Sequence, residues 1–123
     1  ISPQEAIYDI ERVRYAYDQP YCLEHTYMPV ALIPGITTEI LYHSIYNYIE
    51  GELKMRIDAA HRISSAARST KKDQEELWLE EVEPVLVVEQ VVYLDNGKPF
   101  EYSITHHRYD LYQICDYTTR ELN

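Results

Sequence analysis

The stretch from Val85 to Leu94 constrains the fold most, because it is rich in valine and only Glu89 and Gln90 in it are polar. Such a run is typical of a strand that is buried on both faces of a sheet. It leads into Asp95-Asn96-Gly97-Lys98, and an Asn-Gly pair is the strongest local signal for a two-residue hairpin turn. Residues 100–108 predict the returning strand, so residues 85–108 predict a β-hairpin.

The N-terminal part predicts a second hairpin. Residues 7–16 and 21–28 are strand-like, and Asp18-Gln19-Pro20 between them has the composition of a turn. The register of this hairpin stays open. A two-residue loop would place Val13 opposite Glu24, whereas a three-residue loop would place Arg14 opposite Glu24. A slip of one residue would exchange the two faces of the strand.

The two hairpins are joined by a segment of mixed pattern. Residues 28–38 contain two prolines and a glycine and predict irregular structure. Apolar residues then recur at helical spacing from Leu41 to Leu53, with a helix start either at Ser44 or nearer Thr38. Residues 57–68 alternate with period two and predict a long strand.

A capping box at Thr70-Lys71-Lys72-Asp73 predicts a short helix through Trp78, and residues 111–117 predict one more strand. At 123 residues, the chain is expected to form one domain of the α+β class. We expect a mostly antiparallel sheet with flanking helices.

The first hairpin also carries a candidate binding site. A spacing of two places Arg12 and Arg14 on one face of a strand, and the returning strand can bring Glu24 beside them. A guanidinium group offers a planar fork of donors to a phosphate or carboxylate. A ladder of surface ion pairs would use the same residues, and the spacing alone does not decide between the two.

Two further positions extend this hypothesis. If Ser44 caps a helix, its hydroxyl could face an anion at the helix start, although a plain cap fits the sequence equally well. Glu101 follows the second turn much as Glu24 follows the first. The two carboxylates could form an acid/base pair or accept hydrogen bonds from sugar hydroxyls. No recognisable nucleophile motif accompanies them, so no catalytic residue is expected.

Composition and motif spacing exclude several other functions. A net charge of −10 argues against nucleic-acid binding by this chain alone. Adjacent His106 and His107 on a strand would point to opposite faces, so no metal site is expected. Cys22 and Cys115 are predicted to be buried free thiols. The chain has no membrane-length apolar run and no signal peptide, which favours a cytoplasmic protein. Its start at Ile1, without an initiator methionine, predicts a fragment of a longer protein.

The motifs occur in a specific order that resembles the effector-binding UTRA domain of GntR-type bacterial transcription regulators, in the HutC branch. The resemblance covers nearly the whole chain. It rests on Glu11-Arg12-Val13-Arg14, Pro20, Leu23-Glu24-His25-Thr26-Tyr27, Pro34-Gly35, Ser44-Ile45-Tyr46-Asn47-Tyr48, the stretch from Tyr93 to Ser103, and Arg108-Tyr109-Asp110. It implies a chorismate-lyase-like fold, a homodimer, and a winged-helix DNA-binding domain that precedes this chain and is absent from it. The first part of the ligand domain itself could be absent as well.

The resemblance also implies the residues that contact an effector. In relatives that bind amino-sugar phosphates, the matching positions are Arg12, Arg14, Glu24, Ser44, Tyr46 and Glu101. Those relatives have a tyrosine six residues after the last glutamate, where this chain has His107, so the identity of the effector is open at that position. The expected function is a sensor, most simply in a repressor, for a sugar phosphate or similar anion, with no cofactor. An enzyme of the chorismate-lyase type and a dimerisation module with an empty pocket are the alternatives.

Overall fold

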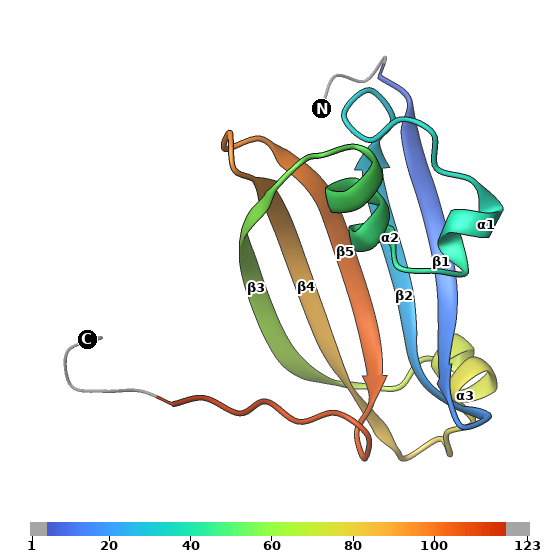
Figure 1. Ribbon diagram of the computed structural model, residues 1–123. Helices are drawn as coiled ribbons and strands as arrows, with labels where there is room; N and C mark the ends of the chain where they lie inside the picture. Colours follow the sequence, from blue (N-terminus) through green and yellow to red (C-terminus); the bar gives the residue numbers. More distant parts are fainter. Residues whose placement is uncertain (1–4, 118–123) are drawn as a thin grey trace.

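Five antiparallel strands form one sheet in the order β1-β2-β5-β4-β3 (Figure 1). This computed structural model describes residues 5–117, so Ile1 and the other first residues lie outside the described part. The strands are β1 (Ile7–Ala16), β2 (Gln19–Pro29), β3 (Ile57–Arg68), β4 (Pro84–Leu94) and β5 (Pro99–Arg108). The predicted α+β class with a mostly antiparallel sheet is confirmed.

The first hairpin turns earlier than predicted, and both predicted registers are wrong. Tyr17 and Asp18 form the turn with left-handed φ angles of 52° and 64°, as the favoured two-residue hairpin turn requires. A β-bulge between Arg14 and Tyr15 then shifts the pairing. As a result Arg12 lies opposite Glu24, and Arg14 lies opposite Cys22.

The second hairpin forms as predicted, with Gly97 at a φ of 83° in the turn. However, β4 is not the central strand and is not buried on both faces. Val88 and Val92 are buried whereas Glu89, on the opposite face, is exposed. The apolar cluster on that opposite face includes Val85 at the start of β4 but does not reach Glu89. The centre of the sheet is β5.

The segment after β5 also differs from the prediction. Residues 111–117 form no strand and extend away from the sheet (Figure 1). Cys115 lies in this segment and is exposed, which contradicts its predicted burial, whereas Cys22 is buried as predicted. Burial and the nearby Glu24 carboxylate raise the pKa of the Cys22 thiol to about 11.

The predicted helix around residues 41–53 divides into short pieces. These are α1 (Thr38–Leu41), α2 (Ile45–Asn47) and the π-helical turn η1 (Tyr48–Glu52), and a separate helix α3 covers Lys71–Leu77. Both predicted start regions are used. Thr37 caps α1 by accepting from the Ile40 N–H, and Ser44 caps α2 by accepting from the Asn47 N–H at 3.2 Å.

Apolar side chains pack against both faces of the sheet. The larger cluster lies beneath α2 and η1 and contains Ile10, Met28, Ile33, Ile45, Ile49, Val92, Leu94 and Phe100. The smaller cluster joins α3 to the other face through Leu23, Leu77, Leu79 and Val85. In residues 5–117, no helix is both long enough and apolar enough to cross a membrane.

Candidate functional site

A cavity of about 280 Å³ lies between the sheet and the start of α2. Its walls come from β1, β2, β4, β5 and the α2 cap. It is lined by Arg12, Arg14, Glu24, Ser44, Ile45, Tyr46, Gln90 and Glu101. Six of the seven predicted site residues therefore meet around one space, although they come from four separate segments of the chain.

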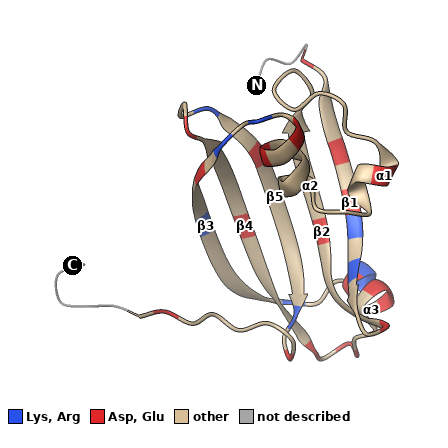
Figure 2. Ribbon diagram, viewed as in Figure 1, with Lys and Arg blue, Asp and Glu red and all other residues tan. Residues whose placement is uncertain are grey.

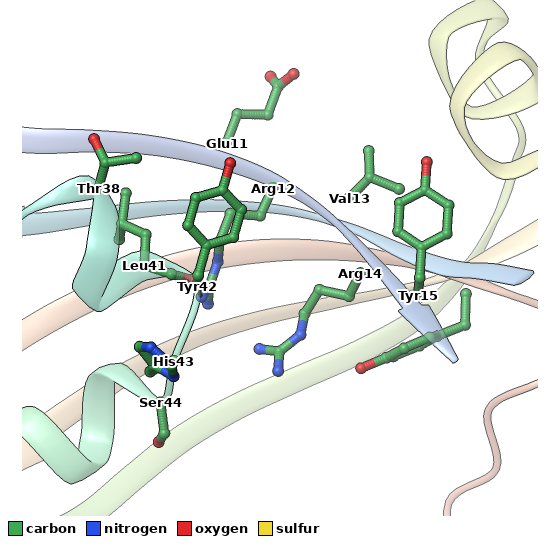
Figure 3. Close-up of a pocket in the computed structure, with 11 residues that line it drawn as sticks. Glu11, Arg12, Val13, Arg14, Tyr15, Thr38, Leu41, Tyr42, His43 and Ser44 are labelled. Atoms are coloured by element: carbon green, nitrogen blue, oxygen red, sulfur yellow. Dashed lines mark hydrogen bonds between the residues drawn. The ribbon is translucent and has the colours of Figure 1, made fainter. Parts of the chain in front are cut away.

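A wider hollow of about 630 Å³ adjoins this cavity and shares Arg12, Arg14 and Ser44 with it. Figure 3 shows this hollow between β1 and the segment that carries α1 and Ser44. The side chains of Arg12 and Arg14 extend from β1 toward that segment. Together the two spaces form a cleft that is open to solvent, with the arginines at the junction.

All three nitrogens of the Arg12 guanidinium group form contacts within the protein. Its Nε donates to Glu24 Oε1 at 3.0 Å, and its Nη2 forms a closer contact with the same oxygen. Its Nη1 donates to the Leu41 carbonyl at 3.2 Å. Both charged side chains are only 18% exposed, so solvent screens the pair less than it screens a surface pair. Arg12 thus joins β1 to β2 and holds the end of α1 over the cavity.

Arg14 is placed differently from Arg12. It is exposed, and no carboxylate of residues 5–117 forms an ion pair with it. Its guanidinium group points across the cleft toward Ser44 and His43 (Figure 3). An uncompensated guanidinium beside a hydroxyl is suited to binding an anionic group of a ligand. Figure 2 shows both acidic and basic positions on β1, so the cleft is not uniformly positive.

Glu101 forms the inner end of the cavity and is only 8% exposed. Its Oε2 accepts from Gln90 Nε2 at 3.1 Å and from the hydroxyls of Tyr46 and Ser103, each at 3.3 Å. Burial raises the pKa of Glu101, and the nearby Glu24 carboxylate adds to this shift. Burial and the Glu101 carboxylate likewise raise the pKa of the Tyr46 phenol. The three donors converge on one oxygen, which leaves Oε1 available to accept from a ligand hydroxyl.

The elevated pKa makes a testable prediction about stability. The folded protein binds the Glu101 proton more tightly than the unfolded chain, so the stability contributed by this group falls as pH rises through the folded-state pKa. We expect Glu101→Gln to unfold at higher urea concentration than the wild type at neutral pH. The difference should shrink as pH falls to 4.5, the ordinary value for this carboxyl. Urea unfolding of both proteins at several pH values between 4.5 and neutral measures this difference in stability. A difference that does not change with pH would contradict the raised pKa of Glu101.

The seventh predicted residue, His107, lies outside the cavity. It is on the same face of β5 as Glu101 and neighbours Cys22 on β2. Its ring stacks on Tyr112 with centroids 3.9 Å apart, and its buried Nδ1 has no hydrogen-bond partner within residues 5–117. Burial lowers the pKa of His107, which favours the neutral ring. A contact between His107 and an effector remains a prediction.

Gln90 lines the cavity but was not predicted from the sequence. It donates to Glu101 and accepts from Arg62 Nε at 3.0 Å, so it connects the cavity to β3. One sign of this role was present in the sequence, because Gln90 is a polar residue within the valine-rich run and lies on the same face of the strand as buried Val88 and Val92.

No group of three or more His, Cys, Asp and Glu side chains in residues 5–117 is arranged to hold a metal ion.

Comparison with known protein families identifies this architecture. Residues 1–113 match the model of the UTRA domain. The chain belongs to the UTRA domain family. This chain is 41% identical over 120 residues to the HTH-type transcriptional regulator GmuR of Bacillus subtilis, and the match covers 98% of this chain and 51% of GmuR. It is 35% identical over 103 residues to the mannosyl-D-glycerate transport/metabolism system repressor MngR of Escherichia coli, covering 84% of this chain and 43% of MngR.

Solved structures agree with this family assignment. The possible transcriptional regulator YydK of B. subtilis superposes with a TM-score of 0.92 at 31% identity, covering 97% of this chain and 52% of YydK. The effector-binding domain of the B. subtilis trehalose repressor gives a TM-score of 0.84 at 31% identity, covering 98% of this chain and 83% of that domain. The fold is therefore the chorismate-lyase-like fold of GntR-family effector domains. The relatives are transcription regulators and not enzymes, so the enzyme alternative is set aside.

The UTRA domain spans about half the length of the curated relatives it matches. What those proteins do as a whole also depends on parts that lie beyond the matched region.

Proposed function

We propose that this UTRA domain senses a sugar phosphate, or a similar small anionic metabolite, for a bacterial repressor in the cytoplasm. The observation that carries the proposal is the exposed guanidinium of Arg14 opposite Ser44, at the mouth of a cavity that also contains Glu24 and Glu101. A cation without an internal partner suits a phosphate, and carboxylates with free lone pairs suit sugar hydroxyls.

The relatives support this chemistry. They include repressors whose names refer to mannosyl-D-glycerate and to trehalose, both of which are sugar compounds. Other relatives are described as HTH-type regulators and are about twice as long as this chain. We therefore assign contact with DNA to a helix-turn-helix domain of the intact regulator, outside the UTRA domain. A net charge of −10 is consistent with this division of roles.

The proposal includes a homodimer. A ligand can change the spacing of two DNA-binding domains only if it stabilises one arrangement of two protomers over another. Arg12 offers a structural element for such a change, because it joins Glu24 in the cavity to the carbonyl of Leu41 at the end of α1. An anion that competes for Arg12 would weaken this connection.

Calorimetry with a panel of sugar phosphates tests the effector class. Arg14→Ala should weaken binding of the phosphate that binds best by about 1.5–3 kcal/mol, the usual scale for a charged hydrogen bond. This corresponds to roughly 10- to 150-fold in Kd. Arg56→Ala, at an exposed arginine outside the cavity, is the matched control and should leave Kd unchanged.

Two different outcomes would contradict different parts of the proposal. Equal affinity of the wild type and Arg14→Ala would remove Arg14 from the site. A wild-type domain that binds none of the phosphates, nor the matching sugars, would contradict the effector class itself.

A further inference from the structure

The two spaces of the cleft differ in the side chains that line them. The inner cavity of about 280 Å³ contains the carboxylates of Glu24 and Glu101. The outer hollow of about 630 Å³ is more than twice as large, and its lining includes three tyrosines and a histidine, namely Tyr15, Tyr21, Tyr42 and His43. Tyr15 is 57% exposed and Tyr42 is 85% exposed. Tyrosine offers a ligand a rigid contact surface at low cost in conformational entropy, so the outer hollow is suited to a ring.

The groups that suit a phosphate lie between these two spaces. Arg12, Arg14 and Ser44 line both of them, and the Arg14 guanidinium extends across the cleft toward Ser44 (Figure 3). A phosphate held there has the carboxylates on one side and the tyrosines on the other. The inner cavity is slightly smaller than the roughly 300 Å³ at the lower end of ordinary ligand sites. A single phosphorylated hexose would occupy it and leave the tyrosines without a contact.

The chemistry of a pyranose ring fits this order of groups. C1 and C5 both adjoin the ring oxygen, so a phosphate on C6 and a substituent on C1 leave the ring at the same edge, and the other hydroxyls lie at the opposite edge. We propose that the effector is an intact glycoside 6-phosphate, with the phosphate on the glycosyl ring and a second ring on C1. The glycosyl hydroxyls then face Glu24 and Glu101, the phosphate binds between Arg14 and Ser44, and the second ring lies against the tyrosines. This inference rests on the proposed function and defines its ligand class.

A smaller hollow offers a second ring another direction, but its lining fits less well. It has a volume of about 260 Å³ and adjoins the inner cavity through Tyr46 and Gln90, both of which donate to Glu101. A ring there would extend from the hydroxyl edge of the hexose, away from the arginines. Among the residues that line this hollow, Tyr46 is the one aromatic side chain. The positions of the arginines and tyrosines therefore favour the outer hollow and a link through C1.

Calorimetry with matched ligands tests this ligand class. The probes are glucose 6-phosphate and mannose 6-phosphate and, for both anomers of each, the methyl and the phenyl glycoside 6-phosphates. The methyl and phenyl glycosides differ only in the second ring. We expect at least one phenyl glycoside 6-phosphate to bind about tenfold more tightly than its methyl counterpart, because its ring buries apolar surface against the tyrosines. The same phenyl glycoside without phosphate should bind more weakly, because it offers Arg14 no anion.

Exposed tyrosines provide both the variants and their control. Tyr42→Ala, alone and together with Tyr15→Ala, removes rings from the outer hollow and should bring the Kd values of the methyl and phenyl glycosides severalfold closer. Tyr17→Ala removes an exposed ring at the first turn, outside the hollow, and should leave the ratio of these Kd values unchanged. The three side chains are largely exposed, so the variants should remain folded, which circular dichroism confirms.

The possible failures separate this inference from the proposed function. If the hexose 6-phosphates bind and no phenyl glycoside binds more tightly than its methyl counterpart, the effector with two rings is wrong and the proposed function stands. If the gain from the phenyl ring persists in full in the double tyrosine variant, the outer hollow does not hold the second ring. If no phosphorylated probe binds, the proposed effector class and this inference are both contradicted.

Discussion

Asp73→Ala should lower the free energy of unfolding by about 3 kcal/mol, which is the sum of a lost helix cap and an unpaired buried polar group. The Asp73 residue is fully buried at the start of α3. Its Oδ2 accepts from the Thr70 N–H at 2.9 Å, and His106 Nδ1 lies 2.8 Å from Oδ1. Alanine would leave both of these groups without their partner.

Urea unfolding of the variant measures this loss, and neighbouring residues supply the controls. Glu76→Ala changes an exposed carboxylate on the same helix and should cost less than about 0.5 kcal/mol. Asp73→Asn keeps an acceptor for Thr70 and should fall between the two. If Asp73→Ala and Glu76→Ala were equally stable, the buried carboxylate would have no structural role.

The strength of local signals explains which elements the sequence predicts correctly. The turn at Asn96-Gly97 and the capping box at Thr70 depend on residues within four positions of each other, and both form as expected. The first turn uses Tyr17 and Asp18 in left-handed conformations, which are common for aspartate among non-glycine residues but unusual for tyrosine. The sequence therefore points to nearby Pro20 instead, and the register prediction fails with it.

The helical segment shows a different limit. Apolar spacing from Leu41 to Leu53 is compatible with one helix, but Thr37 and Ser44 each cap a separate short turn. Ile45 and Ile49 follow that break and pack onto the sheet, and the position of the sheet is not a local property. Likewise β4 contains the most apolar run of the chain and is nevertheless not central.

The candidate site was predictable as an ordered set of motifs, but its geometry was not. Two arginines at a spacing of two could equally form a surface ladder. Their different roles follow only from the register, which pairs Arg12 with Glu24 and places Arg14 opposite Cys22, with no carboxylate partner among residues 5–117. Gln90 was missed because one polar residue in a valine-rich strand has meaning only once Glu101 is beside it.

Phe100→Ala should have the largest effect on stability, about 3–5 kcal/mol, as expected for loss of a buried aromatic ring. Phe100 is fully buried in the larger apolar cluster, at the start of β5 and immediately before Glu101. Its ring also meets Tyr46 edge to face, with centroids 6.2 Å apart and an interplanar angle of 63°. The same side chain therefore supports the sheet and one wall of the cavity.

Because Phe100 contacts both the apolar cluster and Tyr46, a pair of variants can separate its effect on stability from its effect on effector binding. Phe100→Leu keeps most of the buried volume, so it should cost less than about 1.5 kcal/mol and remain folded. It removes the aromatic edge that supports Tyr46, however, and with it a constraint on the hydroxyl that donates to Glu101. We therefore expect Phe100→Leu to weaken effector binding severalfold in calorimetry while its urea midpoint stays close to the wild-type value. Unchanged affinity in a folded Phe100→Leu variant would mean that α2 alone positions Tyr46, through the Ser44 cap and the burial of Ile45.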